Sequence, residues 1–81
     1  MNMVAKEVRE KVIKPKLAEF FGNIIANALV SKAAVAGMRG SSDKEKLKLM
    51  VESICSDQKV LGMWGMAQTN KQKNEWLNLI Q

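Results

Sequence analysis

The 81-residue chain has no histidine and no tyrosine, and Cys55 is its only cysteine. Without histidine or tyrosine, proton transfer near neutral pH would depend on carboxylates or lysines, and the eight acidic residues are scattered along the chain. No base can be named beside Cys55 to activate its thiol, so we interpret it as a small, half-buried hydrophobic residue. The sequence therefore predicts a protein that is not an enzyme and has no catalytic residues.

Ligands for metals and cofactors are equally scarce. One thiol without histidine cannot build a closed zinc site, and a single cysteine cannot form an intrachain disulfide. The segment GMWG at residues 62–65 lacks the Lys-Ser/Thr pair that follows the glycines of a phosphate-binding loop. We therefore expect neither a metal nor a cofactor. The unpaired cysteine and the lack of a signal-peptide pattern in residues 1–16 predict a cytoplasmic protein.

A long hydrophobic run is also missing. The uncharged stretch from Phe20 to Ser31 has twelve residues, whereas a membrane-spanning helix needs roughly 20. We therefore expect no transmembrane segment. The N-terminal helix predicted below combines lysines with an apolar stripe, so peripheral binding to a membrane surface through this basic amphipathic helix is one alternative function.

Arginine is rare in an otherwise basic chain. Thirteen Lys/Arg residues against eight Asp/Glu give a net charge of +5, and only Arg9 and Arg39 carry a guanidinium group. Guanidinium groups suit bidentate phosphate contacts better than ammonium groups do. This charge balance favours an ordinary solvated surface over a nucleic-acid partner.

The length of the chain limits it to a single domain, residues 1–81. A core of this size rarely supplies more than about 3–5 kcal/mol of stability without a disulfide, a metal or a partner. Because the first two are not expected, a partner subunit is the natural source of further stability. The sequence therefore predicts a homo-oligomer, most simply a two-fold dimer.

Helical spacing appears first in residues 3–13. Val4, Val8 and Val12 recur at intervals of four, with Glu–Lys pairs four residues apart on the remaining surface. Pro15 follows and leaves two alternatives, because it can open a new helix at its first turn or kink one long helix. We favour the break.

The run Leu17–Met38 has the strongest helical pattern and predicts a central hydrophobic helix. Its apolar positions at helical spacing are Leu17, Phe20, Phe21, Ile24, Ile25, Ala28 and Leu29. Beside them, Ala18, Gly22 and Ala26 recur at intervals of four. Small residues at this spacing would let a second helix approach closely.

Capping signals mark the later helices. Ser42 and Glu45 form a capping-box pattern, and the helix that they begin should end near Cys55. Its buried face would comprise Leu47, Met50, Val51 and Ile54. Ser56-Asp57-Gln58 resembles a second turn and cap.

Beyond that turn, we expect Val60–Ala67 to be helical although Gly62 and Gly65 weaken its propensity. A short C-terminal helix, with Trp76 and Ile80 on one face, completes the chain. Helices at residues 43–68 would have the lengths of a helix-turn-helix, so a DNA-binding helical domain is a second alternative function. The second helix, however, presents apolar residues that suit burial.

These patterns predict an all-α protein, a small bundle of four helices, or five if Pro15 separates two, around a central hydrophobic helix and completed by dimerisation. No motif resembles that of a known family. We expect a non-enzymatic interaction, assembly or regulatory protein that acts as a homo-oligomer and can bind a protein partner. The candidate interface residues are Ala18, Gly22, Ala26, Met63, Trp64 and Met66.

Overall fold

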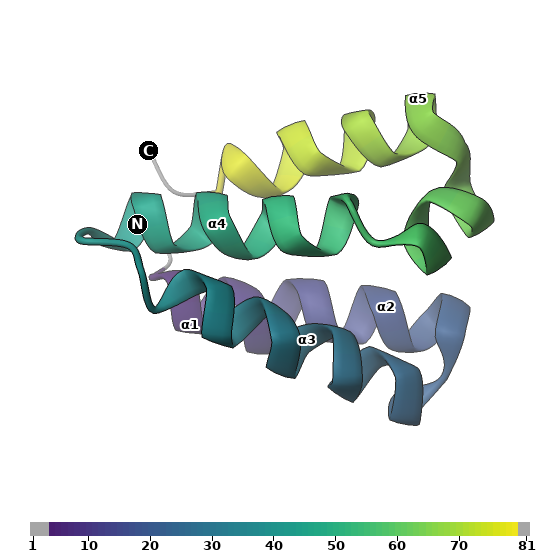
Figure 1. Ribbon diagram of the computed structural model, residues 1–81, viewed down its shortest axis with the longest axis horizontal. Helices are drawn as coiled ribbons and strands as arrows, with labels where there is room; N and C mark the ends of the chain where they lie inside the picture. The colour runs from purple at the N-terminus through teal and green to yellow at the C-terminus, as the bar shows by residue number, and fades with distance from the viewer. Residues whose placement is uncertain (1–3, 80–81) are drawn as a thin grey trace.

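The computed structural model describes residues 4–79, which are helical apart from short connections and contain no strand. In chain order the elements are α1 (Ala5–Val8), the π-helical η1 (Arg9–Ile13), α2 (Lys14–Phe21), α3 (Asn23–Gly37), α4 (Asp43–Cys55) and α5 (Gln58–Leu77). The first three run into one another, so the described residues form four helices. Figure 1 shows α4 between α5 and α3, with the first helix behind. The all-α prediction is confirmed.

The N-terminal helix, which we define as Ala5–Phe21, passes through Pro15 without a break. Ile13 and Lys14 keep right-handed helical angles, with φ −69° and −58°, so the favoured break at Pro15 is wrong. The Lys14 N–H donates to the Arg9 carbonyl in a π-helical bond. This wider turn lies just before the proline, where an α-helix would have to accommodate both a missing N–H and a bulky ring.

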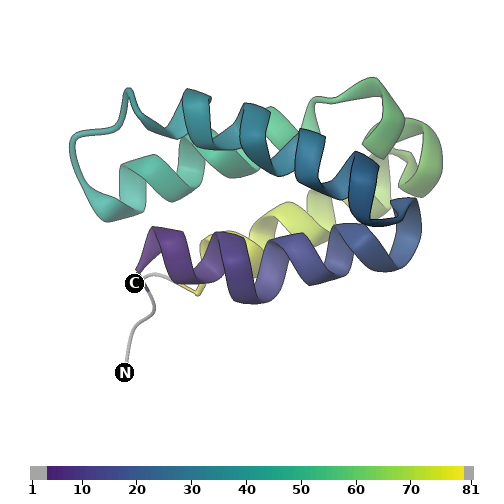
Figure 2. The same cartoon turned by 90° about the horizontal axis from the view of Figure 1, so that it is seen from below.

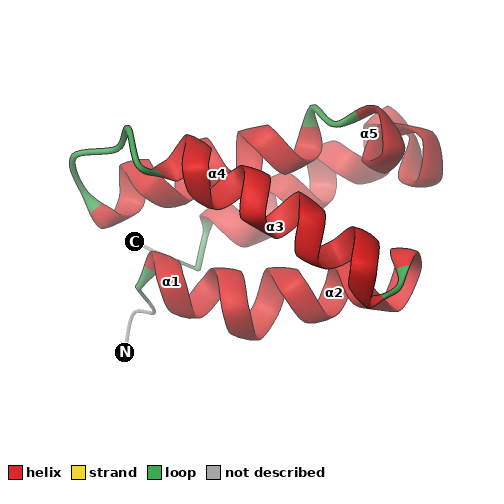
Figure 3. Cartoon of the chain, turned by 60° about the horizontal axis from the view of Figure 1, so that its bottom comes forward, coloured by secondary structure: helices red, strands yellow, loops and turns green. Residues whose placement is uncertain are grey.

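Gly22 divides the run Leu17–Met38, which is therefore not the single central helix that we predicted. Its φ of 84° and ψ of 165° end α2 and turn the chain into α3. Residues that carry a side chain rarely adopt a positive φ, whereas glycine does so at little cost. Figures 2 and 3 show the resulting hairpin, whose two helices meet at this corner and diverge away from it.

A second corner occurs at Gly65 within α5, where φ is 79° and ψ is 164°. The hydroxyl of Thr69, which is buried, donates to the Gly65 carbonyl at 2.7 Å. The helix expected over Val60–Ala67 is therefore interrupted at Gly65. The expected C-terminal helix exists as the second half of α5 and buries Trp76, whereas Ile80 lies outside the described residues.

The predicted caps are present around α4. The Glu45 N–H donates to the Ser42 hydroxyl at 3.2 Å, although the Glu45 carboxylate accepts from Ser41 rather than completing the box. Asp57 caps α5 by accepting from the Lys59 N–H at 2.8 Å.

A longer-range contact joins the beginnings of two helices. The Ala5 N–H donates to the Asp43 carboxylate at 2.6 Å. Because the first N–H groups of a helix have no partner within it, this bond satisfies one of them and ties the N-terminal helix to α4.

The core lies between the inner faces of the four helices. All four residues predicted for the buried face of α4 are buried. Gly37 of α3 packs against this face, since a Cβ at that position would lie 2.7 Å from Met50 Cγ. The buried apolar side chains are Ala5, Val8, Ile13, Leu17, Ala26, Leu29, Val30, Ala33, Leu47, Met50, Val51, Ile54, Cys55, Val60 and Trp76.

Candidate interaction surface

Helix α3 is apolar on both its inner and its outer side. The inner side, which faces the bundle, consists of Ala26, Leu29, Val30, Ala33 and Gly37. The outer side carries three large apolar residues that remain open to solvent, with exposed fractions of 86% for Ile24, 66% for Val35 and 79% for Met38. Globular helices usually place polar residues opposite their buried stripe, so this outer side is unusual.

The exposed residues form one continuous stripe. We call it the α3 outer face and define it as Ile24, Ala28, Ser31, Val35 and Met38, all of which are exposed. Their spacing alternates between four and three residues, which keeps every side chain on the same side of a helix. This is the spacing of the contact seam between two packed helices in a coiled coil.

Charge is nearly absent from this helix. Lys32 is the one charged residue in α3, and its Nζ atom lies 3.6 Å from an Asp57 carboxylate oxygen at the start of α5. The ammonium group is therefore drawn away from the outer face towards its own chain. The α3 outer face itself contains no charged residue.

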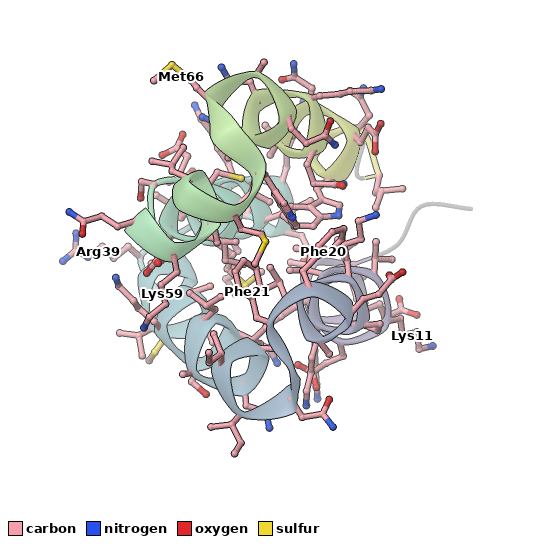
Figure 4. All side chains as sticks on the ribbon, turned by 90° about the vertical axis from the view of Figure 1, so that its right-hand side faces the viewer. Lys11, Phe20, Phe21, Arg39, Lys59 and Met66 are labelled. Atoms are coloured by element: carbon pink, nitrogen blue, oxygen red, sulfur yellow. The ribbon has the colours of Figure 1, made fainter. Side chains whose placement is uncertain are left out.

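An aromatic cluster joins the two glycine corners at one end of the bundle. The Trp64 ring lies 5.4 Å from the Phe20 ring, 6.2 Å from the Phe21 ring and 6.1 Å from the Trp76 ring, measured between centroids. Such pairs contribute roughly 0.5–1.5 kcal/mol each beyond burial. Figure 4 looks onto this end and shows Phe20 and Phe21 between the corners. Trp64 therefore links the N-terminal helix to α5.

Other large side chains around the corners are exposed. We call Phe20, Ile25, Met63 and Met66 the corner surface; Met63 is 53% and Met66 73% exposed. The corners lie within two uncharged runs, residues 20–31 and 60–70, and the fold brings these runs to the same end of the molecule (Figure 1). The corner surface shares no residue with the α3 outer face, and half of it comes from α5.

The predicted interface residues fall in three different environments. Gly22 is exposed and ends α2, so Ala18, Gly22 and Ala26 do not share one helix. Ala26 is buried, and Ala18 packs partly against the core. Among the later residues, Met63 and Met66 are exposed, whereas Trp64 is the partly buried centre of the aromatic cluster. The structure does not bring the six together as one surface.

Most of the α3 outer face was not predicted from the sequence. The apolar positions predicted for the central helix include Ile24 and Ala28 but not Ser31, Val35 or Met38. The alternating spacing of four and three was present in the sequence. It could not identify an outer face, because α3 has apolar residues on both sides and periodicity alone does not say which side a bundle covers.

The described residues offer little for chemistry. Burial raises the pKa of the Cys55 thiol to about 11, although nearby Lys73 acts in the opposite direction. The Cys55 Sγ lies 3.9 Å from the Thr69 carbonyl oxygen. A thiol with this pKa is a poor nucleophile near neutral pH. Residues 4–79 contain no group of three His, Cys, Asp or Glu side chains that could hold a metal ion.

The surface hollows among the described residues measure about 250–490 Å³, and all of them are wide open to solvent. The best-defined one, about 250 Å³ in volume, lies between α1, α3 and α4. Small-molecule sites usually measure about 300–1,000 Å³. Asp43, one of the charged residues around this hollow, is already bonded to the Ala5 N–H. Exposed apolar surface is therefore a better candidate site than a pocket. Within residues 4–79, no helix combines the length and the apolar character needed to cross a membrane.

Comparison with models of protein families, with curated proteins and with solved structures finds no match for this chain. The function is therefore inferred from the geometry and chemistry of the two apolar surfaces. Of these, the α3 outer face is the more regular, because four of its residues lie in α3, Met38 is the C-cap of that helix, and the spacing is that of a helix–helix contact.

Proposed function

We propose that the protein is a non-enzymatic interaction module that associates with a second copy of itself, most simply as a two-fold dimer. The observation that carries this proposal is the apolar outer side of α3, where Ile24, Val35 and Met38 are all more than 60% exposed. Burying one large aliphatic side chain stabilises a protein by about 1.5–3 kcal/mol. Covering this face would therefore stabilise the chain appreciably.

A second copy fits the small size of the chain. The 81 residues contain one cysteine, so no intrachain disulfide supports the core. Association of folded chains adds stability by mass action, because only the folded state presents the assembled apolar face. A self-complementary surface can be covered by a second copy of the same chain. Two-fold dimers are the commonest closed assemblies.

No specific observation favours the DNA-binding alternative at residues 43–68. The second helix of that pair spans only residues 58–64 before the Gly65 corner. Its side chains include buried Val60 and exposed Met63, whereas a recognition helix presents polar groups to base edges. Salt-dependent binding to duplex DNA would nevertheless support this alternative against ours.

Peripheral membrane binding through the N-terminal helix also lacks support. The apolar stripe that would enter the lipid includes Val8, which is fully buried, and Val12, which packs against the core. Insertion would therefore require this helix to leave the bundle. The exposed side of the helix is largely charged.

Sedimentation velocity over roughly 10 μM to 1 mM protein tests self-association directly, since this range covers weak dimers. We expect the sedimentation coefficient to rise from that of a monomer to that of a dimer. A monomer at every concentration would reject the proposed function.

A further inference from the structure

We propose that two copies pair through the α3 outer face, with their α3 helices antiparallel and the two-fold axis passing close to Ser31. This inference rests on the proposed self-association and specifies its geometry. The occupant of the face is thus a second copy of the same helix, rather than a different protein or a membrane.

Two pairs of side chains along α3 are arranged symmetrically about Ser31, although the counterpart of Val35, four residues before Ser31, is Asn27. Ile24 stands seven residues before it and Met38 seven residues after it. A two-fold axis at Ser31 reverses one helix against the other and places Ile24 of each chain opposite Met38 of its partner. Every contact then occurs twice, as an isologous interface requires.

Small residues lie on either side of the proposed axis. Ala28 lies three residues before Ser31, and Ala34, which is half-buried, lies three residues after it. An antiparallel two-fold axis places these alanines opposite each other. Small side chains at the crossing point let two helix backbones approach closely, while the larger residues pack on either side.

The electrostatics also permit this arrangement. Lys32 is next to Ser31, so a two-fold axis there brings the two Lys32 residues near each other. Each ammonium group has its own counter-ion, since the Lys32 Nζ to Asp57 Oδ2 distance is 3.6 Å within the same chain. This pair offsets the repulsion between like charges that would otherwise oppose association.

The size of the face predicts a weak dimer. A 15-residue helix is about 22 Å long and about 10 Å wide. This area is well below the roughly 800 Å² per partner of a standard stable interface. We therefore expect a dissociation constant in the micromolar range or weaker, and the concentrations used below reflect that expectation.

Disulfide trapping tests the position of the axis. Helices packed about 8–10 Å apart, each with a Cα radius of about 2.3 Å, bring facing Cα atoms to about 3.5–5.5 Å. The upper half of this range, above about 4.4 Å, is compatible with a disulfide. Under mild oxidation of the full chain, Ser31→Cys should form covalent dimers at least about ten times faster than Asn70→Cys, which places a thiol at an exposed position of α5. Native Cys55 should not interfere because it is buried.

Charge substitution tests the face independently. Val35→Glu should weaken dimerisation at least about tenfold in sedimentation, because it would bury one carboxylate from each chain in a largely apolar contact beside the amide of Asn27. Met66→Glu is the matched control, since Met66 is similarly exposed (73%, against 66% for Val35) but belongs to the corner surface. It should leave the dissociation constant unchanged. Circular dichroism checks that both variants remain helical.

The outcomes separate the two proposals. A wild-type monomer would reject self-association itself. A wild-type dimer in which Ser31→Cys crosslinks no faster than Asn70→Cys, or in which Met66→Glu dissociates and Val35→Glu does not, would overturn the α3 geometry alone. A monomer that co-sediments with phosphatidylglycerol vesicles, and loses this on Val35→Glu substitution, would assign the face to lipid and overturn both.

Discussion

At the scale of single residues, Gly22 and Gly65 have nearly the same backbone conformation, with φ near 80° and ψ near 165°. A Cβ atom at either position would meet no atom within 4 Å. Glycine is therefore required by the backbone angle and not by lack of space. The two residues create both corners at the aromatic end of the bundle.

Gly22→Ala should lower the free energy of unfolding by about 1–2 kcal/mol, because an L-residue with positive φ is strained. Gly62 provides the matched control, since it lies in a helical part of α5 with equally open surroundings. Gly62→Ala should be neutral or raise the free energy of unfolding by up to about 1 kcal/mol. Urea denaturation measures both, and equal effects would contradict the assigned role of Gly22.

Titration of the Cys55 thiol makes the stability of the fold depend on pH in the alkaline range. Its folded-state pKa of about 11 lies above the ordinary value of 9.0, so the folded protein holds the thiol proton more tightly than the unfolded chain does. The resulting stability is present in full below pH 9 and is lost as the pH rises towards 11.

The free energy of unfolding of the wild type should therefore fall more steeply between pH 9 and 11 than that of Cys55→Ala, by at most about 1.4 kcal/mol per pH unit. The comparison cancels the titration of lysines, which both proteins share. Parallel pH profiles would show that the thiol titrates normally in the fold.

At the scale of helices, local signals predicted most beginnings and ends. The Ser42 cap and the Asp57 cap are both present, because capping depends on residues within one turn of each other. The predicted helix break at Pro15 is wrong because the effect of a proline depends on the turn that precedes it. A π-helical turn at residues 9–13 lets the N-terminal helix continue, and propensity rules do not anticipate such a turn.

Ser42→Ala should lower the free energy of unfolding by about 1 kcal/mol, as expected when an N-cap hydroxyl is removed. Ser41→Ala is the control, because the neighbouring hydroxyl bonds only to the exposed Glu45 side chain and should contribute less than about 0.5 kcal/mol. Thermal or urea unfolding distinguishes them. If both substitutions cost the same, the Ser42 cap does not stabilise α4.

At the scale of the whole molecule, one tryptophan joins distant parts of the chain. Trp64 contacts Phe20, Phe21 and Trp76, although its indole N–H is buried and has no hydrogen-bond acceptor among the described residues. The ring therefore stabilises the bundle by packing, while its polar N–H lowers the net gain.

Trp64→Ala should lower the free energy of unfolding by about 3–5 kcal/mol through loss of this packing. Trp64→Phe should cost only about 1–2 kcal/mol, because it keeps a ring and removes the unpaired donor. Urea denaturation followed by circular dichroism measures both. A phenylalanine variant as unstable as the alanine variant would show that the indole N–H finds a partner in solution.

The sequence by itself determined that the chain is helical, where most of its helices begin, and that it has few groups suited to catalysis or metal binding. These properties depend on composition and on residues within a few turns of one another. Only the tertiary structure decided that Gly22 divides the central run and that Ile24, Val35 and Met38 remain outside. The physical reason is that α3 is apolar on both sides, so its burial depends on where the other helices pack.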